Sequence, residues 1–213
     1  MRFTTALFDL DGTLVDTGPL IVKSFQHTFR TALDRDISEQ EVYRHFGETL
    51  EETFKQYAPG RVAELLQIYR TFNQANHDRL VIRLDGMEEA VRTLHRHGVK
   101  LAVVTSKLSR TARRGLEVSG LLPYFDTVVG VEMTARHKPD PTPLYLALEL
   151  LGETAGQHVL MVGDTTADVC CGKNAGVQTA VVGWSHIERA ELEAAAPDHW
   201  LEQPRDLVRL VLE

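Results

Sequence analysis

No run of 18 consecutive apolar residues occurs in this chain of 213 residues, which argues against a transmembrane helix. The N-terminus lacks a basic segment followed by an apolar one, so we expect no secretion signal. Basic residues are in the minority, and the net charge of −7 argues against a nucleic-acid partner. Only two cysteines occur, and the adjacency of Cys170 and Cys171 suits neither an ordinary disulfide nor a metal site. We therefore expect both cysteines to pack on a helix in a reducing cytoplasm.

Apolar residues make up 43% of the chain and charged residues 25%, as in ordinary globular proteins. Short apolar runs alternate with helical patterns, and this alternation predicts an α/β fold with a Rossmann-like, three-layer parallel-sheet core. Predicted helices at 86–97, 142–151 and 166–175 each end at a glycine suited to a left-handed cap. The predicted strands lie near 3–8, 99–104, 127–131, 158–162 and 178–182, with a last short strand at 198–202 and a final helix around 205–212.

Residues 18–83 interrupt this alternation, because they contain several helical patterns and no convincing strand. Ser38 and Glu41 form a capping-box pattern, and His77 is expected at a helix end or on the surface. We expect a core of residues 1–17 and 84–213, with a small helical cap of residues 18–83 inserted after the first strand as a lid. A stripe at helical spacing is interpreted as the core of this cap: Val62, Leu65, Leu66, Tyr69 and Phe72.

The first predicted strand delivers two carboxylates, Asp9 and Asp11, into a glycine turn. In an open α/β sheet, chemistry takes place beyond the carboxyl ends of the strands. Two carboxylates 4 Å apart repel each other by about 4 kcal/mol if the effective dielectric constant is near 20. The two acids therefore indicate either a metal site or two different protonation states, with a solvated Asp-Gly turn as the alternative.

Later strand ends carry the other groups that phosphoryl transfer needs: a hydroxyl at Thr105, an ammonium at Lys138, and carboxylates at Asp164 and Asp168. Each residue has an ordinary alternative role. Thr105 and Asp164 suit helix caps, Lys138 suits a solvated surface, and Asp168 suits the first turn of a helix. Ser109 is expected to cap the helix that follows Thr105. Taken together, these strand ends favour a phosphate site with a Mg²⁺ ion held by oxygen ligands.

The four segments resemble, in order and spacing, the four motifs of the haloacid dehalogenase superfamily, and the insertion resembles the small helical cap of that family. The resemblance implies that Asp9 is the nucleophile and takes the phosphoryl group as an aspartyl-phosphate. Asp11 is then the general acid for the leaving oxygen and the general base for water. Thr105 and Lys138 are implied to hold phosphoryl oxygens.

The same resemblance implies a Mg²⁺ site made by Asp9, the backbone carbonyl of Asp11, and Asp164, with Asp168 orienting these ligands. A phosphomutase and a non-catalytic interaction module are the alternatives of another class. Thr13 favours a phosphatase over a mutase, and a module would be expected to have lost one of the catalytic side chains.

Within the superfamily, the sequence is similar to phosphoglycolate phosphatases and, more closely, to the bacterial pyrophosphatases that resemble them. This likeness rests on residues 69–81, on Lys107 and Leu108, and on residues 138–152. It implies a small phosphorylated substrate, inorganic pyrophosphate first, with 2-phosphoglycolate or a broad set of phosphomonoesters as the alternative. We expect a cytoplasmic monomer or homodimer with no membrane partner. The residues expected to bind substrate are Gly47, Thr105, Ser106, Lys107 and Lys138, with Arg70 as a further donor from the cap.

Overall fold

The computed structural model describes all 213 residues and contains a six-stranded sheet in the order β5-β4-β1-β6-β7-β8. Every strand is parallel to its neighbours. The predicted α/β fold is therefore confirmed, and each predicted strand agrees with the structure to within two residues at either end. The strands are β1 (Thr5–Phe8), β4 (Lys100–Val104), β5 (Thr127–Val129), β6 (Val159–Gly163), β7 (Gln178–Val182) and β8 (His199–Leu201).

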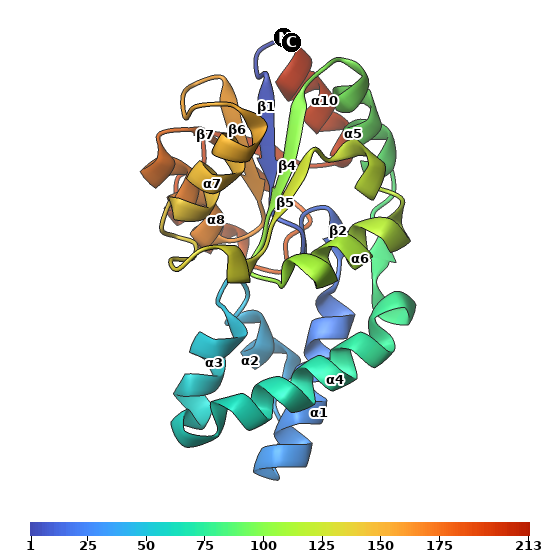
Figure 1. Cartoon of the computed structure of the whole chain (residues 1–213), viewed down its shortest axis with the longest axis vertical. Coiled ribbons are helices and arrows are strands. Elements are labelled where there is room, and N and C mark those ends of the chain that lie inside the picture. Colours follow the sequence, from blue (N-terminus) through green and yellow to red (C-terminus); the bar gives the residue numbers. More distant parts are fainter.

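Helices cover both faces of this sheet, which makes the core a three-layer structure (Figure 1). Successive residues of a strand point to opposite faces, so Ala6 and Phe8 of β1 pack into one hydrophobic cluster and Leu7 into the other. The first face is covered by α5 (Met87–Arg96), α6 (Ser109–Ser119) and α10 (Pro204–Leu212), and the second by α7 (Thr142–Leu151) and α8 (Thr166–Ala175). The shorter helices of the core are α9 (Arg189–Ala194) and the 3₁₀ turns Leu122–Tyr124 and Val131–Met133.

Three helices are each followed by a predicted glycine, at which the chain turns back. Gly98, Gly152 and Gly176 all have a positive φ, between 67° and 77°, which confirms the predicted left-handed helix ends. The two cysteines lie on α8 as free thiols, also as predicted. None of the helices is both long enough and apolar enough to cross a membrane.

Four helices form a separate group beyond the carboxyl ends of the strands, on the opposite side of the molecule from both termini (Figure 1). They pack around a hydrophobic cluster of their own, centred on Phe25, Phe29 and Phe54. Leu65 and Tyr69 of the predicted stripe belong to this cluster, whereas Phe72 stacks on His27 outside it. These helices, called the cap below, are α1 (Gly18–Leu33), α2 (Glu39–Tyr43), α3 (Leu50–Tyr57) and α4 (Val62–Leu80), with a 3₁₀ turn at Pro59–Arg61.

The two segments that join the cap to the core lie side by side. β2 (Val15–Asp16) and β3 (Ile82–Arg83) pair as a two-stranded antiparallel sheet. The prediction that residues 18–83 contain no strand is therefore wrong at their last two residues. A two-residue strand is too short to show an alternating pattern in the sequence. Its pairing depends instead on where the chain leaves and re-enters the core.

A ring contact also joins the cap to the core. The imidazole of His186, in the loop after β7, stacks on the ring of Tyr43 in α2, with centroids 4.7 Å apart and planes within 7°. His186 Nε2 also lies 3.2 Å from Asp16 Oδ1 in β2.

At the start of α2, Ser38 accepts a hydrogen bond from the Glu41 N–H at 3.2 Å, but the Glu41 carboxylate binds Arg35 instead of completing the predicted capping box.

Candidate active site

A tight turn after β1 directs the first carboxylate toward β6. The Asp9 N–H donates to the Val162 carbonyl at 2.9 Å, which continues the β1–β6 ladder by one residue. Gly12 then adopts a φ of +79°, and a Cβ atom there would lie 2.2 Å from Asp164 Oδ2. Only glycine meets both conditions, so Gly12 allows the turn after β1 to approach the residue that ends β6.

Lys138 lies at the centre of the site, in the loop before α7 and not at a strand end as predicted, because a 3₁₀ turn and a loop follow β5. It is 8% exposed, so the alternative of a solvated surface lysine is wrong. Its Nζ atom is 2.7 Å from Asp9 Oδ1, 2.7 Å from Asp168 Oδ1 and 3.2 Å from the Val104 carbonyl oxygen. Burial alone would lower the pKa of Lys138, but Asp168 and Asp9 outweigh this effect and raise the pKa above its ordinary value. The ammonium group therefore stays charged and has three acceptors for its three N–H groups.

Asp164 and Asp168 have different partners. Thr165, not Asp164, is the N-cap of α8, so the helix-cap alternative for Asp164 is wrong. Asp168 is in the first turn of α8, as its alternative role predicted, and its Oδ2 accepts from Thr165 Oγ1 at 2.7 Å and from two backbone N–H groups. Asp164 Oδ1 accepts from Thr13 Oγ1 at 3.1 Å, whereas its Oδ2 is buried and has no hydrogen-bond partner.

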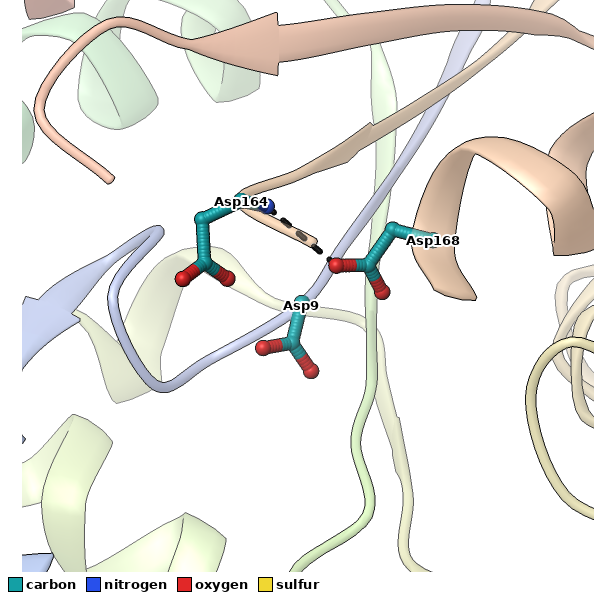
Figure 2. A group of neighbouring side chains, drawn as sticks. All are labelled: Asp9, Asp164 and Asp168. Atoms are coloured by element: carbon teal, nitrogen blue, oxygen red, sulfur yellow. Dashed lines mark hydrogen bonds between the residues drawn. The ribbon is translucent and has the colours of Figure 1, made fainter. Parts of the chain in front are cut away.

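Three carboxylates converge at this point, and Figure 2 shows Asp9, Asp164 and Asp168 facing one another from the ends of β1 and β6 and the start of α8. One oxygen of each lies within 4.8 Å of the others, and all three residues are buried. Burial, opposed by Lys138, raises the pKa of Asp9 to about 7. Burial and the neighbouring charges of Asp9 and Asp168 raise the pKa of Asp164 well above its ordinary value. With one ammonium among three buried acids, the cluster has an excess of negative charge that a cation would offset.

Asp11 lies outside this cluster. Its Oδ1 accepts from Lys107 Nζ at 2.5 Å and from Thr17 Oγ1 at 2.5 Å, and the two contacts fix the orientation of the side chain. Lys107 belongs to the loop after β4, and Thr17 immediately precedes α1 of the cap. The Asp11 carboxylate is thus held next to the cluster at the entrance to the cap.

The loop after β4 also contacts the cap. Thr105 is buried, and its Oγ1 accepts from the Lys107 N–H at 3.2 Å, which differs from the helix-cap alternative. Ser106 Oγ donates to the Gly47 carbonyl at 3.2 Å, so the predicted cap loop at Gly47 lies against the site. The prediction for Ser109 is wrong: Leu108 is the N-cap of α6, and the Ser109 hydroxyl binds Glu132 instead.

A cavity of about 180 Å³ lies between the core and the cap. Every residue predicted to bind substrate lines it, so the cavity brings together residues from four separate parts of the sequence. The lining residues include Asp9, Asp11, Gly47, Arg70, Thr105, Ser106, Lys107 and Lys138. Asp164 and Asp168 do not line the cavity, but Asp168 is hydrogen-bonded to Lys138 and Thr165, which do.

Comparison with known proteins agrees with this geometry. The family model described as haloacid dehalogenase-like hydrolase matches residues 6–182. The chain belongs to the haloacid dehalogenase-like hydrolase family. Pyrophosphatase PpaX of Halalkalibacterium halodurans is 41% identical over 211 residues, which cover 99% of this chain and 98% of that protein. As a member of this family with such relatives, the chain is a phosphohydrolase.

Solved structures share the fold over almost the whole chain. A haloacid dehalogenase-like hydrolase of Streptococcus pneumoniae has a TM-score of 0.87 at 23% identity, covering 98% of each chain. A structure from Haemophilus somnus described as a "predicted phosphoglycolate phosphatase" has a TM-score of 0.86 at 22% identity and covers 99% of this chain and 98% of its own. At these identities the likeness extends to the fold alone.

Two residues of the site escaped the sequence analysis. Thr17 contacts Asp11, and Ser185 Oγ donates to the Asp164 carbonyl at 2.6 Å, although neither belongs to a recognisable motif. The position of Thr17 six residues after Asp11, at the start of a helix, is the one signal that could have indicated its contact. His77 is at the end of α4 as expected, but it is buried and not on the surface.

Replacing Lys138 with methionine removes the one cation that the buried acids share. We expect Lys138→Met to lower the free energy of unfolding at pH 8 by about 3 kcal/mol or more, because Asp9 and Asp168 lose their charged partner. A buried carboxyl with a raised pKa, such as that of Asp9, keeps its proton to a higher pH in the folded state than in the unfolded state. The folded state therefore loses stability as the pH rises through the raised pKa. The deficit of the variant should therefore be smaller at pH 5 than at pH 8 in urea titrations.

Lys100→Met is a matched control for this measurement. Lys100 Nζ lies 2.7 Å from Glu153, but the lysine side chain is 43% exposed. Solvent weakens such a pair, so we expect a loss of about 1 kcal/mol or less. A loss for Lys138→Met that does not exceed the loss for this control would contradict the assigned role of the buried ammonium.

Proposed function

We propose that this protein is a Mg²⁺-dependent phosphohydrolase that forms an aspartyl-phosphate on Asp9, with inorganic pyrophosphate as its substrate. The observation that carries the proposal is the position of Asp9. Its carboxylate contacts the buried ammonium of Lys138, lies near the carboxylates of Asp164 and Asp168, and lines the cavity shared with the cap. A cytoplasmic location is part of the same proposal.

The donor set fits a hard divalent cation. Asp164 Oδ2 is a buried carboxylate oxygen without a partner, which is a costly arrangement unless a cation binds there. Asp9 offers its second oxygen, since Oδ1 is bound to Lys138. Both oxygens of Asp168 already have donors, so this residue is suited to orient Lys138 and α8. We assign Asp9, Asp164 and the Asp11 carbonyl as ligands and Asp168 as their support; bound Mg²⁺ would supply positive charge to the transferring phosphoryl group.

The side chains of the site have complementary roles in the proposed reaction. Asp9 attacks the phosphorus atom, and the bond from phosphorus to the bridging oxygen breaks as the Asp9 oxygen–phosphorus bond forms. Asp11 donates a proton to the departing oxygen and then accepts one from the water that hydrolyses the aspartyl-phosphate. Lys138 and the donors around Thr105 stabilise the charge on the phosphoryl oxygens. Positioned charge of this kind is the main contribution a protein makes to phosphoryl transfer.

The size of the cavity supports a small substrate. Its volume of about 180 Å³ is below the roughly 300–1,000 Å³ of pockets that hold drug-sized ligands. Pyrophosphate and 2-phosphoglycolate both fit this limit, whereas nucleotides and phosphoproteins exceed it. The name of the 41% identical relative favours pyrophosphate between these two. Phosphoglycolate phosphatase activity is the second candidate, because 2-phosphoglycolate also fits the cavity and the sequence also resembles enzymes of that kind.

Asp9→Asn tests the nucleophile. An amide oxygen is a far weaker nucleophile than a carboxylate, so turnover of pyrophosphate should fall by about 10³-fold or more while the protein still folds. Phosphate release measures turnover, and thermal unfolding checks the fold. Asp85→Asn, on the exposed surface, should keep wild-type activity. A tenth of the wild-type rate in Asp9→Asn would exclude Asp9 as the nucleophile.

The metal assignment has a readout that does not depend on turnover. Mg²⁺ at 100 times its dissociation constant should stabilise the wild-type protein by about 2.7 kcal/mol, whereas Asp164→Asn should show no such gain. With a chelator present, Asp164→Asn should be at least as stable as wild type, because it removes a buried, unpartnered carboxylate. Full activity in excess chelator, or equal stabilisation of both proteins by Mg²⁺, would refute this site.

The choice of substrate is tested by comparing two small anions. We expect kcat/KM for pyrophosphate to exceed that for 2-phosphoglycolate by about tenfold or more, a difference of about 1.4 kcal/mol in transition-state stabilisation. Phosphate release at several concentrations of each compound gives both values. The reverse order would assign the protein to phosphoglycolate, and similar values on many sugar phosphates would indicate a broad phosphomonoesterase.

A further inference from the structure

The cavity between cap and core contains one cation that has no ionic partner. Three lysine or arginine side chains line it: Lys138, Lys107 and Arg70. Lys138 is bound to Asp9 and Asp168, and Lys107 is bound to Asp11. Arg70 forms no salt bridge and no side-chain hydrogen bond, and its Nε atom is buried without a partner. It is therefore the cation in this cavity that is free to bind an incoming anion.

The helix that carries Arg70 is firmly placed. Tyr69, Asn73 and His77 recur every four residues along α4 and are all buried. Asn73 Nδ2 donates to Ser24 Oγ of α1 at 3.2 Å, which fixes α4 against α1 within the cap. Arg70 follows Tyr69 by one residue, and both side chains line the cavity together with Asn73 and Gln74 of the same helix.

The nearby acid does not neutralise Arg70. Glu51 lines the same cavity, and the charge of Arg70 contributes to lowering its pKa, but Lys55 is the main cause. Glu51 Oε1 lies 2.8 Å from Lys55 Nζ, and both side chains are more than half exposed. The guanidinium is thus left with a buried N–H group that no protein oxygen accepts, which is unfavourable until a ligand supplies the acceptor.

We propose that Arg70 binds the anionic leaving group of the substrate, and that it selects substrates whose leaving group carries a negative charge. The inference rests on the proposed function, in which Asp9 attacks one end of the substrate on the core side. Arg70 belongs to the cap, across the cavity from Asp9, and so is placed to meet the other end. A guanidinium binds a phosphate or a carboxylate through two parallel hydrogen bonds, which suits the second phosphate of pyrophosphate and the carboxylate of 2-phosphoglycolate.

The assignment is tested by replacing Arg70 and varying the charge of the leaving group. 2-Hydroxyethyl phosphate matches 2-phosphoglycolate in size but has a neutral leaving group. In Arg70→Gln, kcat/KM should fall about 30-fold or more for pyrophosphate and 2-phosphoglycolate and less than threefold for 2-hydroxyethyl phosphate. Arg70→Lys should recover part of the loss, since a lysine keeps the charge but not the paired hydrogen bonds.

Arg79→Gln is the matched control, because Arg79 is on the same helix, is exposed and contacts only Asn76. It should change none of the three kcat/KM values. An equal loss on all three substrates in Arg70→Gln would indicate a structural role and overturn the proposal, as would no loss on either anionic substrate. If the wild-type enzyme prefers 2-phosphoglycolate and Arg70→Gln selectively loses it, the choice of pyrophosphate fails while the role of Arg70 stands.

Discussion

The contact of Lys138 with Asp9 and Asp168 is the interaction on which the rest of the site depends. One ammonium group joins the end of β1, the end of β4 through the Val104 carbonyl, and the first turn of α8. Without it, buried acids would face one another in a medium that screens charge poorly, at a cost of several kcal/mol. All three N–H groups of Lys138 already have protein acceptors. In the proposed reaction, its contribution to an incoming phosphoryl group is therefore mainly electrostatic.

In the proposed function, the chemistry belongs to the core and the choice of substrate to the cap. The carboxylates follow strand ends or belong to the first turn of α8, and Lys138 is in the loop before α7, whereas Arg70 and Gly47 are on the cap. Two contacts join the cap to the core: the pairing of β2 with β3 and the stacking of Tyr43 on His186. Substitutions in the cap can therefore alter the leaving-group side of the cavity without disturbing the acids that carry the proposed reaction.

The sequence predicted the sheet and the convergence of the site because both follow from local pattern. Parallel strands are buried on both faces and stand out as apolar runs, and their carboxyl ends lie at one edge, which predicted Asp9 and Asp164 at the same edge. Their direct contact also depends on β1 lying next to β6, and no local pattern gives that strand order. The contacts between the cap and the core could not be predicted from local pattern. The stacking of Tyr43 on His186 and the pairing of β3 join parts of the chain that no periodicity connects. Polar side chains near a helix start were also ambiguous, as Ser109 shows, since its hydroxyl binds Glu132.

The most direct test of the account is whether phosphate is transferred to Asp9. Asp11→Asn should slow hydrolysis more than it slows attack on a substrate with a good leaving group, so the covalent species should accumulate. Acid quenching within milliseconds of mixing with radiolabelled pyrophosphate, followed by peptide mapping, locates the label. The account predicts a single label on the peptide containing Asp9, stable in acid and released by hydroxylamine as expected for an acyl phosphate. Turnover without any labelled protein, or a label on another residue, would contradict it.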